Sequence, residues 1–379
     1  MARLSRELAA KGVDVVSLSL GEPDFDTPDH VKVAAKKAID DNFSHYTPIS
    51  GFLDLRKAIS EKFKRENNLD YSPEQIVVST GAKQSIANVV MSIVDKGDEV
   101  ILLSPYWVSY LEIVKLAEGT PVFVKAGIET NFKVTPAQIE AAITPQTRML
   151  MFSSPCNPTG SVYNAVELKA IAEVLAKYEN IIVLSDEIYE HINFVEKPTS
   201  IASFDFLKDR VVTVNGLSKA YAMTGWRLGY IGAALWIAKA CDKMQGQITS
   251  GTSSITQMAA IAALNSAPEV TQTMNAEFLR RRNLCYTLLS EIPGLVSNKP
   301  EGAFYFFPQV SSFFGKSFEG KEIKNADDLC MYLLYQGNVA VVAGDGFGAP
   351  DCIRLSYATS EANLRKAISR LKEALGKLV

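Results

Sequence analysis

Short apolar runs alternate with amphipathic segments over the first two thirds of the chain. The apolar runs predict strands at 75–79, 99–103, 121–124, 148–153, 181–185 and 211–214. Between them, helical periodicity predicts helices at 84–94, 108–116 and 167–178. The runs at 181–185 and 211–214 are apolar on both faces, which is typical of strands in a mostly parallel sheet covered by helices on each side. The order of these elements predicts a doubly wound α/β unit.

The pattern differs at the two ends of the chain. A helical stretch near 267–292 is followed by strands and helices that indicate a smaller α+β unit, with strands at 303–308, 339–342 and 352–357 and helices near 326–335 and 361–375. At the N-terminus, a short helix and an apolar run lead into the turn-rich sequence GEPDFDTP. Within it, Thr27 is a good N-cap and Pro28 suits the first helical position, so a helix is expected to begin there.

Composition and charge narrow the class of protein. The 379 residues are 47% hydrophobic and 21% charged, which suits a globular chain with a substantial core and excludes a disordered one. The formal charge of −3 comes from 39 basic and 42 acidic residues. This near balance argues against nucleic acid as a partner, because nucleic-acid binders normally carry a basic excess.

Cysteine and histidine usage points away from metals and disulfides. The five cysteines form no CxxC pair, and none of the three histidines are spaced for a shared metal, so no metal site is expected. The N-terminus lacks the apolar core of a signal peptide, and no apolar run of about 18 residues predicts a membrane span. We therefore expect a reduced, soluble protein in the cytoplasm, without membrane contact.

Two charged residues follow strands that should be buried. Asp186 comes directly after the run at 181–185, where a carboxylate costs free energy unless it is paired. Lys219 follows the strand at 211–214 in a small-residue, apolar context, where desolvation would lower its pKa and make it a nucleophile. Taken singly, Asp186 is equally well a helix cap or a salt-bridge partner, and Lys219 is more often a surface lysine.

Phosphate and carboxylate binding have separate candidates. The turn Ser79–Lys83 (STGAK) joins a strand to a helix, so its backbone N–H groups form either an anion site or an ordinary turn. The glycine-rich segment 344–349 leads into a strand, which excludes a dinucleotide site there. Arg354 alternates with Ile353 and Leu355, so it faces the other side of its strand and binds either an acid of the chain or a ligand carboxylate.

Together these segments resemble a known family. From about Val13 to the C-terminus the chain is similar to the fold-type I pyridoxal-phosphate aminotransferases of class I/II, and most similar to the bacterial Ib-type aspartate aminotransferases. The resemblance is carried by GEPDFDTP, TGAKQ, SPYWVSY, SPCNPTG, SDEIYE, NGLSKAYAMTGWRLGY, EGAFY and IRLSYA. It implies an α/β fold, with a large domain (30–268) holding a mostly parallel seven-stranded sheet between helices. A smaller α+β domain would be discontinuous, formed by 1–29 and 269–379.

The resemblance also implies a cofactor, pyridoxal 5′-phosphate, and the residues that hold it. Lys219 should be the Schiff-base lysine and the proton shuttle, and Asp186 should pair with the pyridine nitrogen. Tyr189 and Asn157 should hydrogen-bond the 3′ oxygen of the ring. Trp107 should stack on the ring and contact the substrate, although a tryptophan is by default a core residue.

The phosphate and the substrate are assigned in the same way. Gly81, Ala82 and Arg227 match phosphate-binding positions, Tyr46 matches the residue that reaches the partner subunit's phosphate, and Ser218 is a further candidate. Many relatives have a serine three residues before the lysine, where this chain has Gly216. For the substrate, the resemblance implies that Arg354 binds the α-carboxylate, assisted by Asn157 and the backbone of Gly21. Lys83 should bind a distal carboxylate, the alternative being an exposed lysine in the first turn of a helix.

The function implied is transfer of the amino group of L-aspartate to 2-oxoglutarate, by a ping-pong mechanism in a homodimer with active sites at the interface. The alternatives are a bifunctional aspartate/prephenate or aromatic aminotransferase and, less favoured, a β-lyase on the same fold. A regulator without activity is disfavoured because the catalytic positions are intact. Family members usually have an N-terminal arm before the position of Met1, so recognition of the substrate's distal group is expected to differ if the arm is missing.

Overall fold

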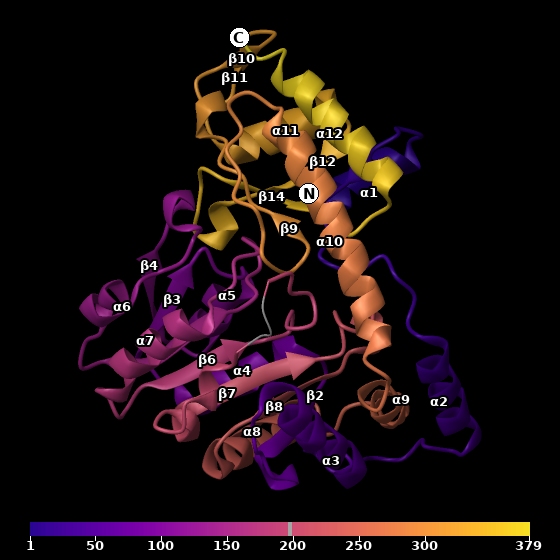
Figure 1. Ribbon diagram of the computed structural model, residues 1–379, viewed down its shortest axis with the longest axis vertical. Coiled ribbons are helices and arrows are strands. Elements are labelled where there is room, and N and C mark those ends of the chain that lie inside the picture. Colours follow the sequence, from indigo (N-terminus) through magenta and orange to yellow (C-terminus); the bar gives the residue numbers. More distant parts are fainter. Residues whose placement is uncertain (196–198) are drawn as a thin grey trace.

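The computed structural model describes residues 1–195 and 199–379, and a seven-stranded sheet forms the centre of its lower lobe (Figure 1). In spatial order the strands are β2 (Ile76–Ser79), β8 (Gly229–Gly232), β7 (Val211–Gly216), β6 (Ile182–Asp186), β5 (Thr147–Ser153), β3 (Glu99–Ser104) and β4 (Thr120–Lys125). Neighbouring strands are parallel except for β8, which is antiparallel to both β2 and β7. The expected mostly parallel sheet is confirmed.

Helices cover both faces of this sheet, as the doubly apolar strands require. One face packs against α4 (Ala82–Ile93), α5 (Ser109–Leu116) and α8 (Leu235–Ile248). The other packs against α2 (Asp29–Asp40), α3 (Leu53–Lys62), α6 (Pro136–Ala142), α7 (Ala165–Ala176) and α9 (Ser254–Leu264). Alternation along β5 divides its side chains between the two cores, with Met149 and Met151 in one and Leu150 and Phe152 in the other.

The upper lobe of Figure 1 is smaller and mixes helices with short strands. Its helices are α1 (Ala2–Ala10), α10 (Glu269–Ser290), α11 (Ala326–Gln336) and α12 (Glu361–Leu375). Its strands are β1 (Val16–Ser17), β9 (Tyr305–Phe306), β10 (Ser317–Phe318), β11 (Lys321–Glu322), β12 (Val339–Ala340), β13 (Val342–Ala343) and β14 (Ile353–Ser356). Val16 pairs with Val339 in a parallel β1–β12 ladder, and its side chain joins a core that also holds Phe278 and Ile368. The upper lobe is therefore built from both ends of the chain.

Three local predictions need correction. The helix α2 begins at Asp29 with Pro28 as its N-cap, and the Thr27 hydroxyl instead donates to the carbonyl oxygen of Ala222 (2.9 Å) and accepts from Trp226 Nε1 (3.1 Å). The Thr27 hydroxyl, which was expected to cap the helix, is thus used in a tertiary contact instead. The strand expected at 339–342 is split, because β12 pairs with β1 whereas β13 pairs with β14. The strand expected at 303–308 is shorter, with β9 limited to Tyr305–Phe306.

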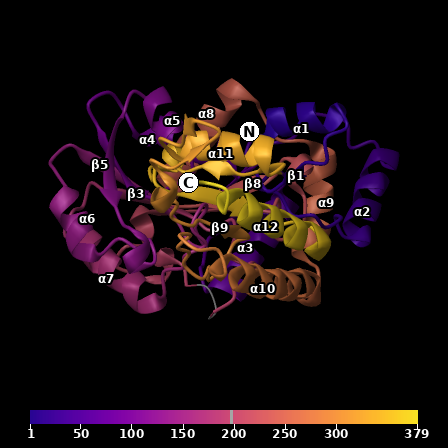
Figure 2. The same cartoon turned by 90° about the horizontal axis from the view of Figure 1, so that it is seen from above.

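The upper lobe lies over the carboxyl edge of the sheet. Seen from above, α11 and α12 cross the middle of the molecule, between α6 and α7 on one side and α2 on the other (Figure 2). The loops that follow β5, β6 and β7 therefore face residues of the upper lobe, which is where ligands bind in open α/β sheets. None of the described helices has the length and the apolar character needed to cross a membrane.

Candidate active site

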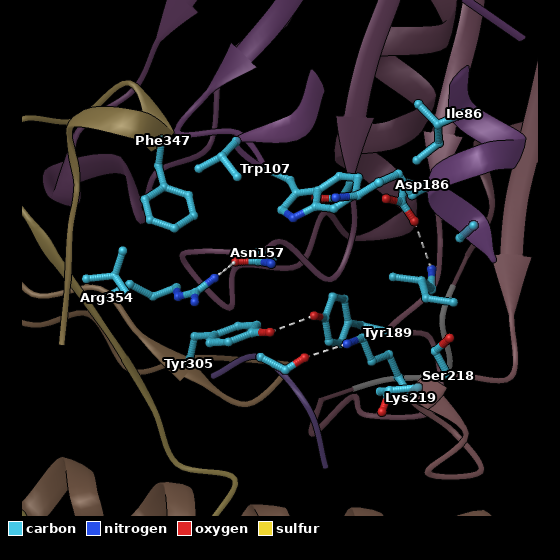
Figure 3. Close-up of a pocket in the computed structure, with 18 of the residues that line it drawn as sticks. Ile86, Trp107, Asn157, Asp186, Tyr189, Ser218, Lys219, Tyr305, Phe347 and Arg354 are labelled. Carbon is cyan, nitrogen blue, oxygen red and sulfur yellow. Dashed lines mark hydrogen bonds between the residues drawn. The ribbon is translucent and has the colours of Figure 1, made fainter. Parts of the chain in front are cut away.

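A pocket of about 510 Å³ lies between the sheet edge and the upper lobe. All predicted site residues except Gly81 and Tyr46 line it: Gly21, Ala82, Lys83, Trp107, Asn157, Asp186, Tyr189, Ser218, Lys219, Arg227 and Arg354. They come from the ends of strands, from the start of α4, and from β14 of the upper lobe. Figure 3 shows Arg354 on the opposite side of the pocket from Asp186 and Lys219.

Asp186 ends β6, and its carboxylate is buried at the edge of the pocket. The Tyr110 hydroxyl donates to Oδ2 at 2.7 Å, and the backbone N–H of Ile188 donates to Oδ1 at 3.2 Å. Burial raises the pKa of Asp186 to about 6, while these two donors and the nearby Lys219 act to lower it. The carboxylate is therefore ionised near neutral pH and available to a cationic partner.

Lys219 follows β7, and its amine donates a hydrogen bond of 2.5 Å to the carbonyl oxygen of Gly21. Burial lowers the pKa of Lys219 to about 8; Arg354 also lowers it, whereas Glu22 and Asp186 raise it. About a tenth of the amine is therefore uncharged at pH 7, and the uncharged form is the one that attacks a carbonyl carbon or accepts a proton.

Arg354 is held by the chain but keeps donors for a ligand. Its guanidinium donates to Asn157 Oδ1 (3.0 Å) and to the carbonyl oxygen of Ser19 (2.9 Å). Its Cζ lies 4.6 Å from the ring centroid of Tyr305, which orients the guanidinium plane. Within residues 1–195 and 199–379, the buried Nε of Arg354 has no hydrogen-bond partner. An oriented guanidinium of this kind suits a carboxylate.

Tyr189 and Tyr305 are hydrogen-bonded to each other, with their hydroxyl oxygens 2.7 Å apart (Figure 3). Tyr189 comes from the loop after β6 and Tyr305 from β9, so this contact joins the two lobes. Burial and the neighbouring Tyr305 raise the pKa of Tyr189 well above its usual value. Both hydroxyls are therefore protonated and able to donate.

The start of α4 lies next to Arg227. Gly81 is the N-cap of this helix with φ at +88°, a conformation that favours glycine. A Cβ at Gly81 would lie 2.5 Å from Nη2 of Arg227, so the guanidinium rests directly against the glycine. The first-turn N–H groups of a helix have no partner within the helix, and together with a guanidinium they suit a phosphate.

Lys83 and Trp107 lie beside each other on one wall. The Lys83 amine is 5.0 Å from the ring centroid of Trp107, and the Trp107 and Tyr110 rings are nearly perpendicular, with 5.5 Å between their centroids. Trp107 is only partly buried, so it presents ring surface to the pocket. Lys83 is thus a pocket residue as well as a first-turn residue of α4.

Besides Gly81, Tyr46 and the position of Gly216 fall outside the lining of this pocket. Tyr46 has 98% of its side chain exposed and lines a separate surface hollow with His45 and Ser253. Gly216 has no room for the serine that many relatives carry there, because a Cβ would lie 2.9 Å from the carbonyl oxygen of Leu228. The hydroxyl expected from relatives is thus excluded by close packing of β7 against the chain before β8.

The pocket walls also include residues that the sequence analysis did not select, among them Ser153, Tyr305 and Phe347, and Tyr110 lies behind Asp186 outside the pocket lining. Tyr305 lies in the EGAFY motif and Tyr110 one helical turn after Trp107, so both carried a weak signal. Phe347 belongs to the glycine-rich segment rejected as a dinucleotide site. The centroid of its ring lies 5.0 Å from Cζ of Arg354. That segment contributes a wall of the pocket instead.

The pocket fits the cofactor that the sequence implies. The lysine amine of lowered pKa suits an aldehyde, and the buried carboxylate suits a pyridine nitrogen. The flat indole suits an aromatic ring, and the start of α4 suits a phosphate. The hydroxyl of Ser153 also lines the pocket, and among the described residues it has no hydrogen-bond partner. Unpartnered buried polar atoms are expected where a ligand supplies the missing partner.

Comparison with known proteins agrees with this chemistry. Residues 13–371 match the family model for aminotransferases of class I and II. A protein of Rickettsia bellii named a probable aspartate/prephenate aminotransferase is 48% identical over 100% of this chain and 96% of its own length.

Two solved structures extend the agreement to the fold. The aspartate aminotransferase from Rhizobium meliloti has a TM-score of 0.96 at 44% identity, covering 100% of this chain and 95% of its own. The aspartate aminotransferase from Thermus thermophilus with maleate has a TM-score of 0.92 at 40% identity, covering 98% of this chain and 95% of its own.

Proposed function

The chain belongs to the class I and II aminotransferases and uses pyridoxal 5′-phosphate, and from this premise we propose that it transfers the amino group of L-aspartate to 2-oxoglutarate. The products are oxaloacetate and L-glutamate, formed in the two half-reactions of a ping-pong mechanism. The observation that carries the choice of substrate is the presence of two cations, Arg354 and Lys83, in one pocket. A dicarboxylic amino acid offers a carboxylate to each.

The bound cofactor supplies an electron-withdrawing pyridine ring that accepts the electron pair left when a substrate Cα–H bond breaks. Asp186 holds a proton at the pyridine nitrogen, which its buried and ionised carboxylate favours. Lys219 would carry the cofactor through its amine, and once the substrate amine has displaced it, that free amine would take the proton from the substrate Cα and deliver it to the cofactor carbon C4′. A pKa of about 8 gives Lys219 enough uncharged amine for both tasks near neutral pH.

The remaining residues bind and orient. Gly81, Ala82 and Arg227 hold the phosphate at the start of α4, with Ser218 nearby. Tyr189 and Asn157, which both line the pocket, would donate to the 3′ oxygen of the cofactor, and Trp107 would stack on its ring. Arg354 binds the α-carboxylate, supported by Asn157, to which it is already hydrogen-bonded, and by the backbone of Gly21.

Prephenate is a second candidate for the amino acceptor. The Rickettsia bellii relative bears both substrates in its name, and prephenate, like aspartate, has two carboxylates. Arg354 and Lys83 would bind the two carboxylates of either substrate. Prephenate and aspartate therefore carry the same number of carboxylates and differ in the distance that separates them. Competition between oxaloacetate and prephenate for one site is the expected behaviour of a bifunctional enzyme.

We further propose a cytoplasmic homodimer with two domains, 30–268 and a second formed by 1–29 with 269–379. The exposed Tyr46 supports the dimer, since its assigned role is to reach the phosphate of the partner subunit. A core that combines Val16 and Leu18 with residues near the C-terminus supports the discontinuous domain. Five buried cysteines, all free, suit a reducing compartment.

The proposal is tested by substituting Lys83. We expect Lys83→Met to lower kcat/KM for aspartate about 10- to 100-fold, because a charge-assisted contact to the distal carboxylate contributes about 1.5–3 kcal/mol. Activity with alanine, which has no distal carboxylate, should stay within about twofold. Steady-state kinetics with both amino donors measures the difference, with oxaloacetate and prephenate compared as acceptors.

The matched control is Lys372→Met, which removes an exposed lysine of α12 that pairs with Glu291 outside the pocket. It should leave both activities unchanged. Equal losses for aspartate and alanine in Lys83→Met would contradict the role of Lys83. Aminotransferase activity that survives Lys219→Ala would contradict the assignment of Lys219.

A further inference from the structure

Tyr110 lies behind the pocket and contacts two of its proposed cofactor-binding residues. It sits in the first turn of α5, fully buried, with its hydroxyl 2.7 Å from Oδ2 of Asp186. The edge of its ring meets the Trp107 ring at 86° and 5.5 Å between centroids. One side chain therefore touches both the carboxylate and the indole that face the pocket in Figure 3.

The hydrogen bond has a fixed direction. Burial and the charge of Asp186 raise the pKa of Tyr110 well above its usual value, so the phenol stays protonated and is the donor. Among the described residues, the only other donor to this carboxylate is the backbone N–H of Ile188, at the longer distance of 3.2 Å. Tyr110 thus provides the shorter of two hydrogen bonds to a carboxylate that burial would otherwise neutralise.

We propose that Tyr110 is a positioning residue, whose hydroxyl orients the Asp186 carboxylate and keeps it ionised so that Asp186 can hold a proton at the pyridine nitrogen of the cofactor. This inference rests on the proposed function of Asp186, and it adds a residue that does not itself line the pocket. The titratable groups around Asp186 are Tyr110 on α5, Cys156 after β5, Tyr189 on its own loop and Lys219 after β7. Lys219 also favours the ionised carboxylate, but only Tyr110 among these side chains donates to it.

The test is made first on the apoprotein. Carbon-13 labelling of aspartate side chains, with Asp186→Asn used for assignment, reports the pKa of Asp186 by NMR. Tyr110→Phe removes one oxygen atom and should raise this pKa by about one to two units, the shift expected for a lost hydrogen bond to a charged group. Tyr106→Phe is the matched control, because Tyr106 is buried on the same segment with its ring stacked on Phe123, and it should leave the pKa unchanged.

A second variant works in the opposite direction. Placing 3-fluorotyrosine at position 110 makes the phenol a stronger donor, so the pKa of Asp186 should fall by a few tenths of a unit. This variant keeps the shape of the wild-type side chain and decides the question if Tyr110→Phe does not fold. A residue with only a packing role would shift the pKa in neither variant.

The third measurement uses the cofactor. The affinity of the apoprotein for pyridoxal 5′-phosphate, followed by absorbance between pH 5 and pH 9, should weaken below the pKa of Asp186. In Tyr110→Phe this weakening should begin about one to two pH units higher. An Asp186 pKa that is the same in Tyr110→Phe and in Tyr106→Phe would overturn the inference. Failure of the wild type to bind the cofactor would instead overturn the proposed function, since the NMR result on Asp186 does not depend on cofactor binding.

Discussion

The amine of Lys219 shows how one residue is prepared for chemistry by its surroundings. Burial favours the uncharged amine, and so does Arg354, while Glu22 and Asp186 favour the charged form. Burial is the largest of these effects, which leaves the pKa at about 8. The amine is thus uncharged often enough to react near neutral pH, yet its hydrogen bond to Gly21 holds it at the pocket.

The expected consequence is a pH-dependent capture of the cofactor. Because only the uncharged amine attacks an aldehyde, the rate at which apoprotein takes up pyridoxal 5′-phosphate should rise about tenfold per pH unit below pH 8 and level off above it. Stopped-flow absorbance measures this rate, with N-α-acetyl-lysine as the reference amine. A profile that keeps rising towards the ordinary lysine pKa, about 10.4, would contradict the role given to burial.

The elements that carry the site residues are joined by a buried polar network. The Lys62 side chain, at the end of α3, is 1% exposed; it donates to Asn67 Oδ1 at 2.8 Å and pairs with Glu190. Glu190 also accepts from Asn67 (2.5 Å) and from Asn215 (2.7 Å) near the end of β7. Since Glu190 follows Tyr189 directly and Asn215 lies at the end of β7, four residues before Lys219, the network fixes two site-bearing segments to one helix.

Loss of Lys62 should therefore destabilise the protein strongly. Lys62→Met leaves Glu190 buried without its cation, for which we expect a loss of about 3–5 kcal/mol in the free energy of unfolding of the apoprotein in urea. Adding Glu190→Gln should restore much of that loss. Lys57→Met on the same helix is the control: Lys57 pairs with Asp54 at the surface, so its loss should cost less than about 1 kcal/mol. Equal effects of the two lysine variants would refute the importance of the network.

The strands and the buried contacts that position the site could be predicted from the sequence to different degrees. Buried apolar runs end abruptly at polar residues, so the strand before Asp186 was located to within a residue. β8 was missed because its run of four residues, Gly229–Gly232, is half glycine and carries little strand signal. The Lys62 network was also missed, because a lysine in a helical pattern gives no sign of burial until α3 meets the segment after β6. Tyr110 likewise depends on a contact across the sheet to Asp186, which no local pattern encodes.

At the scale of the whole molecule, the pocket is assembled from distant parts of the chain. Gly21, Lys219 and Arg354 all line it. Lys219 follows β7 of the lower lobe, whereas Arg354 lies in β14 of the upper lobe and donates to the carbonyl oxygen of Ser19, in the same segment as Gly21. Tyr46, in contrast, extends from the surface into solvent, in a hollow lined by Phe43, Thr47 and Ile255. A second copy that covers this hollow would complete the set of proposed site residues.

Subunit mixing tests this arrangement. Tyr46→Ala and Lys219→Ala should each have low activity alone, because each variant damages every site of its own homodimer. Unfolding and refolding the two together should form hybrids in which one site has both Lys219 and Tyr46 intact, so activity should rise several-fold above the sum of the parents. Activity that never exceeds the sum would mean that Tyr46 acts within its own chain or not at all.

The pairing of β1 with β12 has a consequence for how the protein is made. The sheet of the lower lobe uses residues 76–232, so on a ribosome it can form while the rest of the chain is still being synthesised. Val16 emerges early, but its strand partner Val339 and the part of its core that lies in α12 emerge only near the end of synthesis. During that interval the N-terminal apolar run is exposed and open to chaperones or to wrong contacts. Arg354 of β14 emerges among the last elements, so the carboxylate site proposed for it would be completed only when synthesis is nearly finished.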